Sequence, residues 1–449
     1  MDLPDRPPFA LRARVLSPLG GGGTLDLQDG IVIVDANGRI GAVRDAGTGD
    51  ETTAVEGTEP VDIRPWVVLP GMVDLHAHLP QLPNAGLGAG MDLLSWLDRY
   101  IFPLERRFDA AGDAVRLAPS AFRAFAAAGT TTVLAYGAVY KASMDGAFRA
   151  AEAHGIRAIL GKVMMDRITY DETIDPSTIL ERSVRESEEL IAEWHGADAG
   201  RLGYAVTPRF AVSCTADMLR ESAALAARTG TWWQTHVSED PGEVAEVARL
   251  FPEASDYVDV YDRAGGLGAR TVLAHAVHLS DRELARLVET DARVAHCPAS
   301  NLFLASGVMP LARYLEAGLK VGLGSDVAGG PEASMFSVMR VGFYAQAALR
   351  TVGGEARKPL GPLEWLRLGT LDGARVLGLE DRIGSLETGK EADLIAVDPR
   401  MTAALPGLSY DPERVDPEEV MSRLIFRTHS DMVRAAWVRG RRLEGPTRE

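Results

Sequence analysis

The sequence of 449 residues predicts an α/β protein whose central part is a (β/α)8 barrel of the TIM-like kind. Eight short apolar runs, rich in β-branched residues, recur between residues 73 and 326, and each is followed by a polar or turn-forming segment. Helical periodicity fills the intervals between these runs. Short buried strands that alternate with helices are typical of parallel sheets. Eight such units over roughly 300 residues describe a closed barrel.

The eight expected strands follow one another along the chain. They span residues 73–78, 131–136, 157–163, 203–208, 231–236, 271–275, 293–296 and 320–326. After the fifth run, apolar residues recur with helical spacing from Val244 to Phe251. Ser280 and Glu283 have the spacing of a capping box, which predicts that a helix begins there.

The two ends of the chain have a different pattern. Short alternating segments separated by glycine-rich turns occur before the barrel, at 30–34 and 39–43, and after it, at 392–397 and 433–438. This alternation is typical of strands with two unlike faces. We therefore expect residues 1–66 and 377–449 to form one small β-sandwich domain beside a barrel domain of residues 67–376.

Composition and charge limit the classes of protein to which the chain can belong. With 46% hydrophobic residues the chain can bury a large core, and its net charge of −16 argues against nucleic acid as a partner. The N-terminus lacks a basic and apolar leader, and no apolar run approaches membrane-spanning length. Cys214 and Cys297 are too few for a disulfide framework. We expect a cytoplasmic protein with no membrane partner.

The end of the first expected strand carries two histidines, His76 and His78. Residues i and i+2 of a strand point to the same side, so both imidazoles can face one small volume. Later strands end in the same chemistry: His236 ends the fifth, His275 the sixth and Asp326 the eighth. Barrels of this kind place their active sites at the carboxyl ends of the strands. The pattern predicts a metal site of imidazoles and one carboxylate.

A further carboxylic acid, Glu239, stands three residues beyond His236, where the fifth strand gives way to a loop. A divalent metal lowers the pKa of bound water to roughly 7 from about 15.7. A nearby carboxylic acid can then carry the proton to a leaving group. The fourth strand ends at Thr207 and Pro208 without a lysine or carboxylate to bridge a second ion. The sequence therefore predicts hydrolysis assisted by one metal.

Seven motifs carry a resemblance that extends over nearly the whole chain. They occupy residues 70–78, 93–97, 102–105, 161–166, 207–210, 296–302 and 322–330. In these motifs the chain resembles the amidohydrolase superfamily, and within it the guanine deaminase family. The His-x-His, His-x-x-Glu and Ser-Asp elements are common to the superfamily. The Thr-Pro-Arg-Phe motif at 207–210 and Gln81, three residues after His78, are more specific to guanine deaminases.

The resemblance implies a metal centre and three catalytic residues. One zinc ion per chain would be bound by His76, His78, His236 and Asp326. Glu239 would protonate the purine ring and then the departing amine. His275 would orient the attacking hydroxide, and Asp326 would act in catalysis as well as in metal binding.

The resemblance also implies the substrate and the residues that hold it. Gln81 and Arg209 would hydrogen-bond the heterocycle, Phe210 would contribute ring or backbone contacts, and His236 would lie beside the ring. An arginine donor prefers a carbonyl oxygen to an amine, which favours guanine over adenine. The implied reaction converts guanine to xanthine and ammonia, as a step of purine catabolism, in a homodimer.

Two alternatives stay open at this point. An enzyme of the same mechanism could act on a pterin, 8-oxoguanine or a triazine, or could remove chloride. A non-enzymatic scaffold is the third class, although the complete ligand set and Glu239 count against it. The chain departs from the family pattern at Ala299 and at Pro331 and Glu332, which lie in loops near the expected pocket. The long segment 81–107 could be a lid, an oligomer contact or a helix packed on the barrel.

Overall fold

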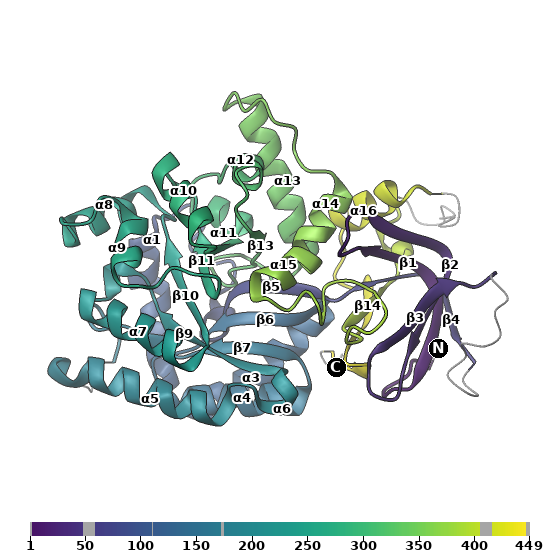
Figure 1. Cartoon of the computed structure of the whole chain (residues 1–449), viewed down its shortest axis with the longest axis horizontal. Helices are drawn as coiled ribbons and strands as arrows, with labels where there is room; N and C mark the ends of the chain where they lie inside the picture. The colour runs from purple at the N-terminus through teal and green to yellow at the C-terminus, as the bar shows by residue number, and fades with distance from the viewer. Residues whose placement is uncertain (1, 48–58, 110, 172–174, 405–414, 446–449) are drawn as a thin grey trace.

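The computed structural model describes residues 2–47, 59–109, 111–171, 175–404 and 415–445. Figure 1 shows a barrel on one side of the molecule and a separate β domain on the other, with both chain termini at the β domain. The fold class predicted from the sequence is confirmed.

The barrel contains eight parallel strands in the order of the sequence. Every residue of the strands from β5 to β11 is buried, as expected for a parallel sheet that is covered on both sides. A two-residue strand, β8 (Val163–Met164), also pairs with β9. The eight strands are β5 (Met72–His78), β6 (Thr130–Tyr136), β7 (Arg157–Gly161), β9 (Leu202–Pro208), β10 (Trp232–Val237), β11 (Thr271–His275), β12 (Arg293–His296) and β13 (Val321–Leu323).

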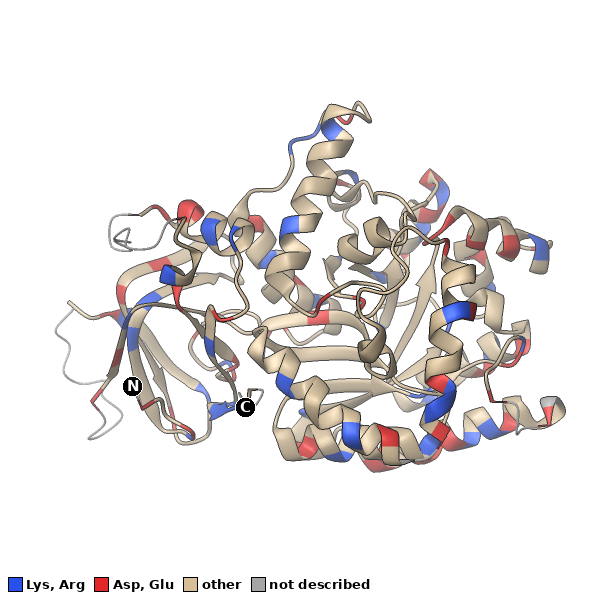
Figure 2. Ribbon diagram, turned by 180° about the vertical axis from the view of Figure 1, so that it is seen from behind, with Lys and Arg blue, Asp and Glu red and all other residues tan. Residues whose placement is uncertain are grey.

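Helices surround the strands, and Figure 2 shows basic and acidic residues interspersed along the helix ribbons. The predicted capping box of Ser280 and Glu283 is present at the start of α10 (Asp281–Glu289). Within the described ranges, no helix is long and apolar enough to cross a membrane. The longer helices are α3 (Ala111–Ala127), α4 (Lys141–His154), α5 (Ile179–Trp194), α7 (Ala216–Thr229), α8 (Pro241–Leu250) and α13 (Met335–Thr351).

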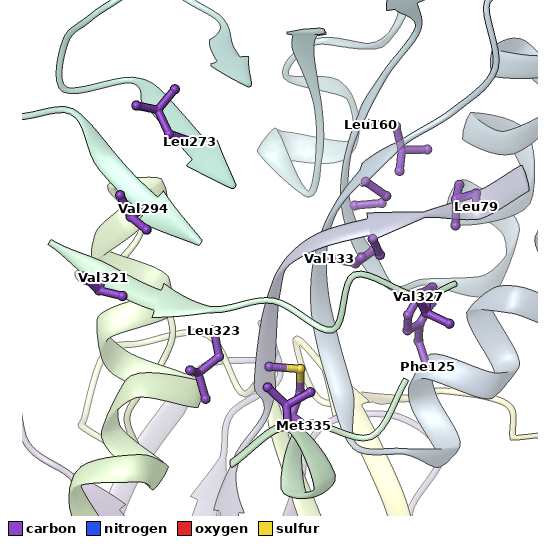
Figure 3. Packing of buried hydrophobic residues seen from close by; sticks show 14 of the residues in the cluster. Leu79, Phe125, Val133, Leu160, Leu273, Val294, Val321, Leu323, Val327 and Met335 are labelled. Carbon is purple, nitrogen blue, oxygen red and sulfur yellow. The ribbon is translucent and has the colours of Figure 1, made fainter. Parts of the chain in front are cut away.

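Two apolar cores lie on the two faces of the barrel strands. Leu273 and Val294 belong to the larger core, and Figure 3 shows them with Val321 on three neighbouring strands. Val272 and Ala295, one position away, belong to a smaller core that also contains residues of α15 (Gly373–Leu377). This alternation follows from the two-residue repeat of a strand. A few buried polar residues, such as Asp74 of β5 and Gln234 of β10, interrupt these apolar faces.

The barrel closes at a seam between its first and last strands. β5 and β13 are the two ends of the hydrogen-bonded strand order, but the loop after β13 is bonded directly to β5. The Asp326 amide donates to the His76 carbonyl at 2.7 Å, and the His78 amide donates to the Val327 carbonyl at 2.9 Å. The buried Asp74 carboxylate accepts from the amide and the hydroxyl of Ser325 at 2.9 and 2.6 Å. The seam therefore holds Asp326 against the two histidines of β5.

Both termini contribute to the small β domain, as predicted. Where a sandwich was expected, all seven strands join one mixed sheet, because β4 pairs with β1 on one side and β14 on the other. Strand β4 continues to Pro70, so the expected boundary at residue 66 falls inside it. The strands are β1 (Phe9–Pro18), β2 (Thr24–Val34), β3 (Ile40–Asp45), β4 (Val61–Pro70), β14 (Leu394–Val397), β15 (Val433–Val438) and β16 (Arg441–Arg442).

Candidate active site

Five residues predicted from the strand ends lie in one buried cluster at the carboxyl end of the barrel. His76 and His78 come from β5, His236 from β10, His275 from β11 and Asp326 from the loop after β13. All five are buried. His275 and Asp326 have left-handed backbones, with φ of 74° and 48°, so the chain bends sharply where these side chains turn inward.

Four of these side chains have the spacing of a metal-binding site. The Nε2 atom of His78 lies 3.3 Å from Nε2 of both His76 and His236. Oδ1 of Asp326 lies 3.1 Å from His76 Nε2 and 3.3 Å from His78 Nε2. Four ligands arranged tetrahedrally at the distances typical of zinc are about 3.3–3.5 Å from one another. The donor set and its separations therefore fit a small divalent ion.

Hydrogen bonds to the outer ring nitrogens orient two of the imidazoles. His236 donates from Nδ1 to the Arg209 carbonyl at 2.6 Å, and His275 donates from Nδ1 to the Asn301 amide oxygen at 2.9 Å. Each bond places the proton on Nδ1 and leaves the Nε2 lone pair directed at the cluster. His236 is thus ready to bind a metal, and His275 is ready to accept a proton.

The protonation states also suit metal binding. Burial lowers the pKa of His76, and burial together with the neighbouring imidazoles lowers the pKa of His236 well below its usual value. Burial opposes ionisation of Asp326, but electrostatic interaction and hydrogen bonds with the imidazoles of His76 and His78 hold the pKa of Asp326 well below its usual value. Neutral imidazoles and an ionised carboxylate are the forms that bind metal ions.

Glu239 has the opposite electrostatic environment. Burial and the negative charges of Asp326, Glu243 and Asp240 raise the pKa of Glu239 well above its usual value. Its Oε2 atom lies 3.3 Å from His275 Nε2, and its backbone amide donates to the Glu243 carboxylate at 2.9 Å. A carboxylic acid that keeps its proton near neutral pH can serve as a general acid.

A pocket opens onto this cluster. It brings together the predicted substrate residues Gln81, Arg209 and Phe210 with Glu239 and three of the four predicted metal ligands. Such a combination of apolar walls with a few convergent polar groups suits a small flat ligand. The lining residues are His78, Gln81, Leu93, Trp96, Leu97, Arg209, Phe210, His236, Glu239, Leu304 and Asp326.

The first loop of the barrel supplies one wall of this pocket. Leu93 and Trp96 of α1 (Leu93–Trp96) are buried, and the Trp96 indole donates to the Leu87 carbonyl at 2.8 Å. The Gly90 amide donates to the Phe303 carbonyl at 2.7 Å, which ties the loop to α11 (Pro298–Phe303), the helix that follows β12. Of the alternatives left open for this segment, packing against the barrel is the one that the structure displays.

Two buried residues near the site have no role in the sequence prediction. Tyr136 ends β6, and its ring centroid lies 4.5 Å from that of His78 and 4.8 Å from that of His236, so it supports both imidazoles. Glu105 ends the short helix α2 (Phe102–Glu105) and forms an ion pair with Arg209 at 2.6 Å. Two features of the sequence could have singled out these residues: Tyr136 stands at a strand end, and Glu105 belongs to one of the seven motifs.

Comparison with known proteins agrees with this geometry. The family described as "Amidohydrolase family" matches residues 67–443. A Deinococcus radiodurans protein named "Probable guanine deaminase" is 38% identical over 419 residues, which is 92% of each chain. The structure of Escherichia coli guanine deaminase superposes with a TM-score of 0.89 at 31% identity, covering 98% of this chain and 100% of that one.

A guanine deaminase from C. acetobutylicum, solved with guanine bound in the active site, superposes with a TM-score of 0.87 at 27% identity. The superposition covers 97% of this chain and 99% of that one. Together, the matching strand-end motifs, the likeness over almost the full length and the buried histidine–aspartate cluster lead to one conclusion. The chain belongs to the guanine deaminase family of the amidohydrolase superfamily.

Proposed function

We propose that this protein is a guanine deaminase that hydrolyses guanine to xanthine and ammonia with one zinc ion per chain. One observation carries the proposal: a single pocket joins a metal-ligand set, a carboxylic acid of raised pKa and an arginine. The similarity to guanine deaminases over more than nine-tenths of the chain supports the choice of substrate.

His76, His78, His236 and Asp326 would hold the zinc ion, because three imidazoles and one carboxylate favour zinc over calcium or magnesium. When bound, zinc acts as a Lewis acid that makes water a nucleophile near neutral pH. The ring of Tyr136 packs against the rings of His78 and His236 and keeps them in place.

Glu239 and His275 would handle the protons of the reaction. Glu239 gives its proton to the ring nitrogen beside the amine-bearing carbon, while the water oxygen forms a bond to that carbon. His275 Nε2 and the Asp326 carboxylate orient the water and accept from it. The water oxygen gives up both of its protons: one replaces the proton that Glu239 gave to the ring, and the other is passed to the amine, after which the carbon–nitrogen bond breaks and ammonia leaves. The oxygen from water becomes the new carbonyl of xanthine.

The opposite edge of the pocket would hold the heterocycle. Arg209 is a permanent donor that suits the 6-carbonyl oxygen of guanine, and Gln81 offers a second polar contact. Phe210 and the apolar residues of the first loop enclose the ring. Adenine would present an amine to the arginine and leave a buried donor unpaired, which costs binding free energy.

The test is the release of ammonia and the formation of xanthine from guanine, measured against adenine, a pterin, 8-oxoguanine and a triazine. We expect guanine to have the highest kcat/KM and adenine to be lower by about 10⁴-fold. Elemental analysis should give one zinc per chain. Rapid turnover of a pterin or triazine without xanthine formation would refute the substrate, and full zinc content without any turnover would favour the scaffold.

We extend the proposal to assembly and context, as the resemblance implies: a homodimer that acts in purine catabolism in the cytoplasm. Light scattering of the purified protein tests the first part, because a monomeric mass at enzyme-assay concentrations would contradict it.

A further inference from the structure

Glu105 lies directly behind the polar edge of the pocket without lining it. The side chain is fully buried at the end of α2. Its Oε1 atom accepts from the Gln81 amide nitrogen at 2.7 Å, and its Oε2 atom accepts from the Arg209 guanidinium at 2.6 Å. Gln81 and Arg209 both line the pocket, whereas Glu105 does not. One carboxylate thus links the two residues that would contact the substrate.

Two aromatic residues hold this arrangement in place. The Tyr170 phenol is buried and accepts from the Val139 amide at 3.0 Å; burial and the charge of Glu105 raise the pKa of Tyr170 well above its usual value, so the phenol keeps its proton. The guanidinium carbon of Arg209 lies 5.3 Å from the centroid of the Phe102 ring. The orientation of the Glu105 carboxylate is therefore determined by the donors of Gln81 and Arg209, one on each oxygen.

The carboxylate determines which end of the Gln81 amide faces the ligand. An ionised carboxylate only accepts hydrogen bonds, so Gln81 must turn its amide nitrogen toward Glu105. The carbonyl oxygen of Gln81 is then left for the pocket. Arg209 uses one N–H on Glu105 and retains further donors in its planar fork. The pocket edge consequently offers an acceptor from Gln81 next to donors from Arg209.

We propose that Glu105 is a positioning residue that sets this order of acceptor and donor, and thereby selects heterocycles in which a ring N–H lies beside a carbonyl group. The inference rests on the proposed function and deepens it by assigning the specificity of the pocket to a residue that does not touch the substrate. Guanine has the selected pattern. A 6-aminopurine has the reverse pattern, with an unprotonated ring nitrogen beside an amine, so both of its polar groups meet like partners.

The discriminating measurement compares guanine with 2,6-diaminopurine. Both compounds carry the same 2-amino leaving group, and they differ only at the edge that Gln81 and Arg209 would read. The ratio of their kcat/KM values therefore reports the order of donors and acceptors. It does not respond to general losses of stability or zinc, which lower both values alike.

Glu105→Gln should reverse one of the two contacts. Arg209 needs an acceptor, so it would take the oxygen of the new amide, and the amide nitrogen would face Gln81. Gln81 would rotate to accept from it and would present N–H groups to the pocket. We expect the guanine to 2,6-diaminopurine ratio to fall by about 10–100-fold. Zinc content should be unchanged, because the Glu105 side chain bonds none of the four ligand side chains.

The exchange variant Gln81→Glu with Glu105→Gln is the matched control. The new amide at position 105 would donate to the new carboxylate at position 81, whose second oxygen again faces the pocket as an acceptor. We expect the ratio to return to within about threefold of the unmodified enzyme. A residue that served only as a counter-charge for Arg209 would not be rescued in this way.

The outcomes separate the possibilities. An unchanged ratio in zinc-loaded Glu105→Gln, or an exchange variant no better than that single variant, would overturn the proposal. If Glu105→Gln alone does not fold, the exchange variant decides, because a collapsed ratio there is incompatible with the proposal. Guanine turnover by the unmodified enzyme tests the proposed function separately, so the failure of one is distinguishable from the failure of the other.

Discussion

The two polar walls of the pocket are built in different ways. The first wall is formed by His78, His236 and Asp326, which together with His76 stand at or just after strand ends, so their positions follow from the barrel itself. The wall of Gln81 and Arg209 depends on Glu105, which belongs to the first loop and lies 104 residues from Arg209 in the sequence. The first wall follows from strand register, whereas the second follows from side chains that meet only after the chain has folded.

The largest loss of activity is expected from removing one of the four predicted zinc ligands. His76→Ala or Asp326→Ala should abolish both zinc binding and turnover, because three remaining donors no longer complete the site. Elemental analysis and steady-state kinetics measure the two losses. His429→Ala, which alters a histidine of the β domain outside the cluster, is the matched control and should keep both. Full zinc content in the ligand variants would show that the wall is not a metal site.

The second largest loss of activity is expected from a change at Glu239, which should separate proton transfer from metal binding. Glu239→Gln should lower turnover by about 10²–10⁴-fold, the range credited to general acid–base catalysis, while zinc and xanthine binding persist. Glu253→Gln changes an exposed glutamate and should have no effect. Near-normal turnover in the Glu239 variant would assign the proton transfer to another group, such as Asp326.

A third variant tests whether Arg209 and Glu105 depend on each other for their stability in the fold. Arg209→Ala should remove most of the activity and lower the free energy of unfolding by about 3–5 kcal/mol, because Glu105 would be left as a buried unpaired charge. Denaturant unfolding measures the change. Arg249→Ala removes an exposed arginine paired with Glu246 and should change stability by less than about 0.5 kcal/mol. Equal stabilities of the two variants would mean that Glu105 is not held by Arg209.

The smallest expected effect is on the pH dependence of stability, and it comes from Glu243 of α8, the helix that follows Glu239. Burial raises the pKa of Glu243 from 4.5 to about 7, although hydrogen bonds from Tyr257 and from the amides of Glu239 and Asp240 oppose the shift. The folded state therefore binds this proton more tightly than the unfolded chain. The contribution to the free energy of unfolding, at most about 3 kcal/mol, is complete below pH 4.5 and is lost as the pH rises to about 7.

Glu243→Gln should flatten the pH dependence of the unfolding free energy in this window, as followed by denaturant titrations at several pH values. A slope identical to that of the unmodified protein would show that Glu243 does not titrate between the two states.

The sequence by itself determined the fold class, the participation of both termini in one β domain and the strand ends that carry the buried histidine–aspartate cluster. These features depend on local patterns, because the burial of a strand and the direction of its last side chains follow from a two-residue repeat. It also singled out Gln81, Arg209 and Phe210, although only through the resemblance to a known family. Their roles in binding stay predictions.

Only the tertiary structure decided how the polar edge of the pocket is organised. Glu105 ends the short helix α2, and nothing in its neighbourhood along the chain indicates that it meets Gln81 and Arg209 at once. The same holds for the single mixed sheet of the β domain, which depends on β4 pairing with strands from both ends of the chain. Long-range pairings of this kind are set by the packing of distant elements, so no local pattern in the sequence encodes them.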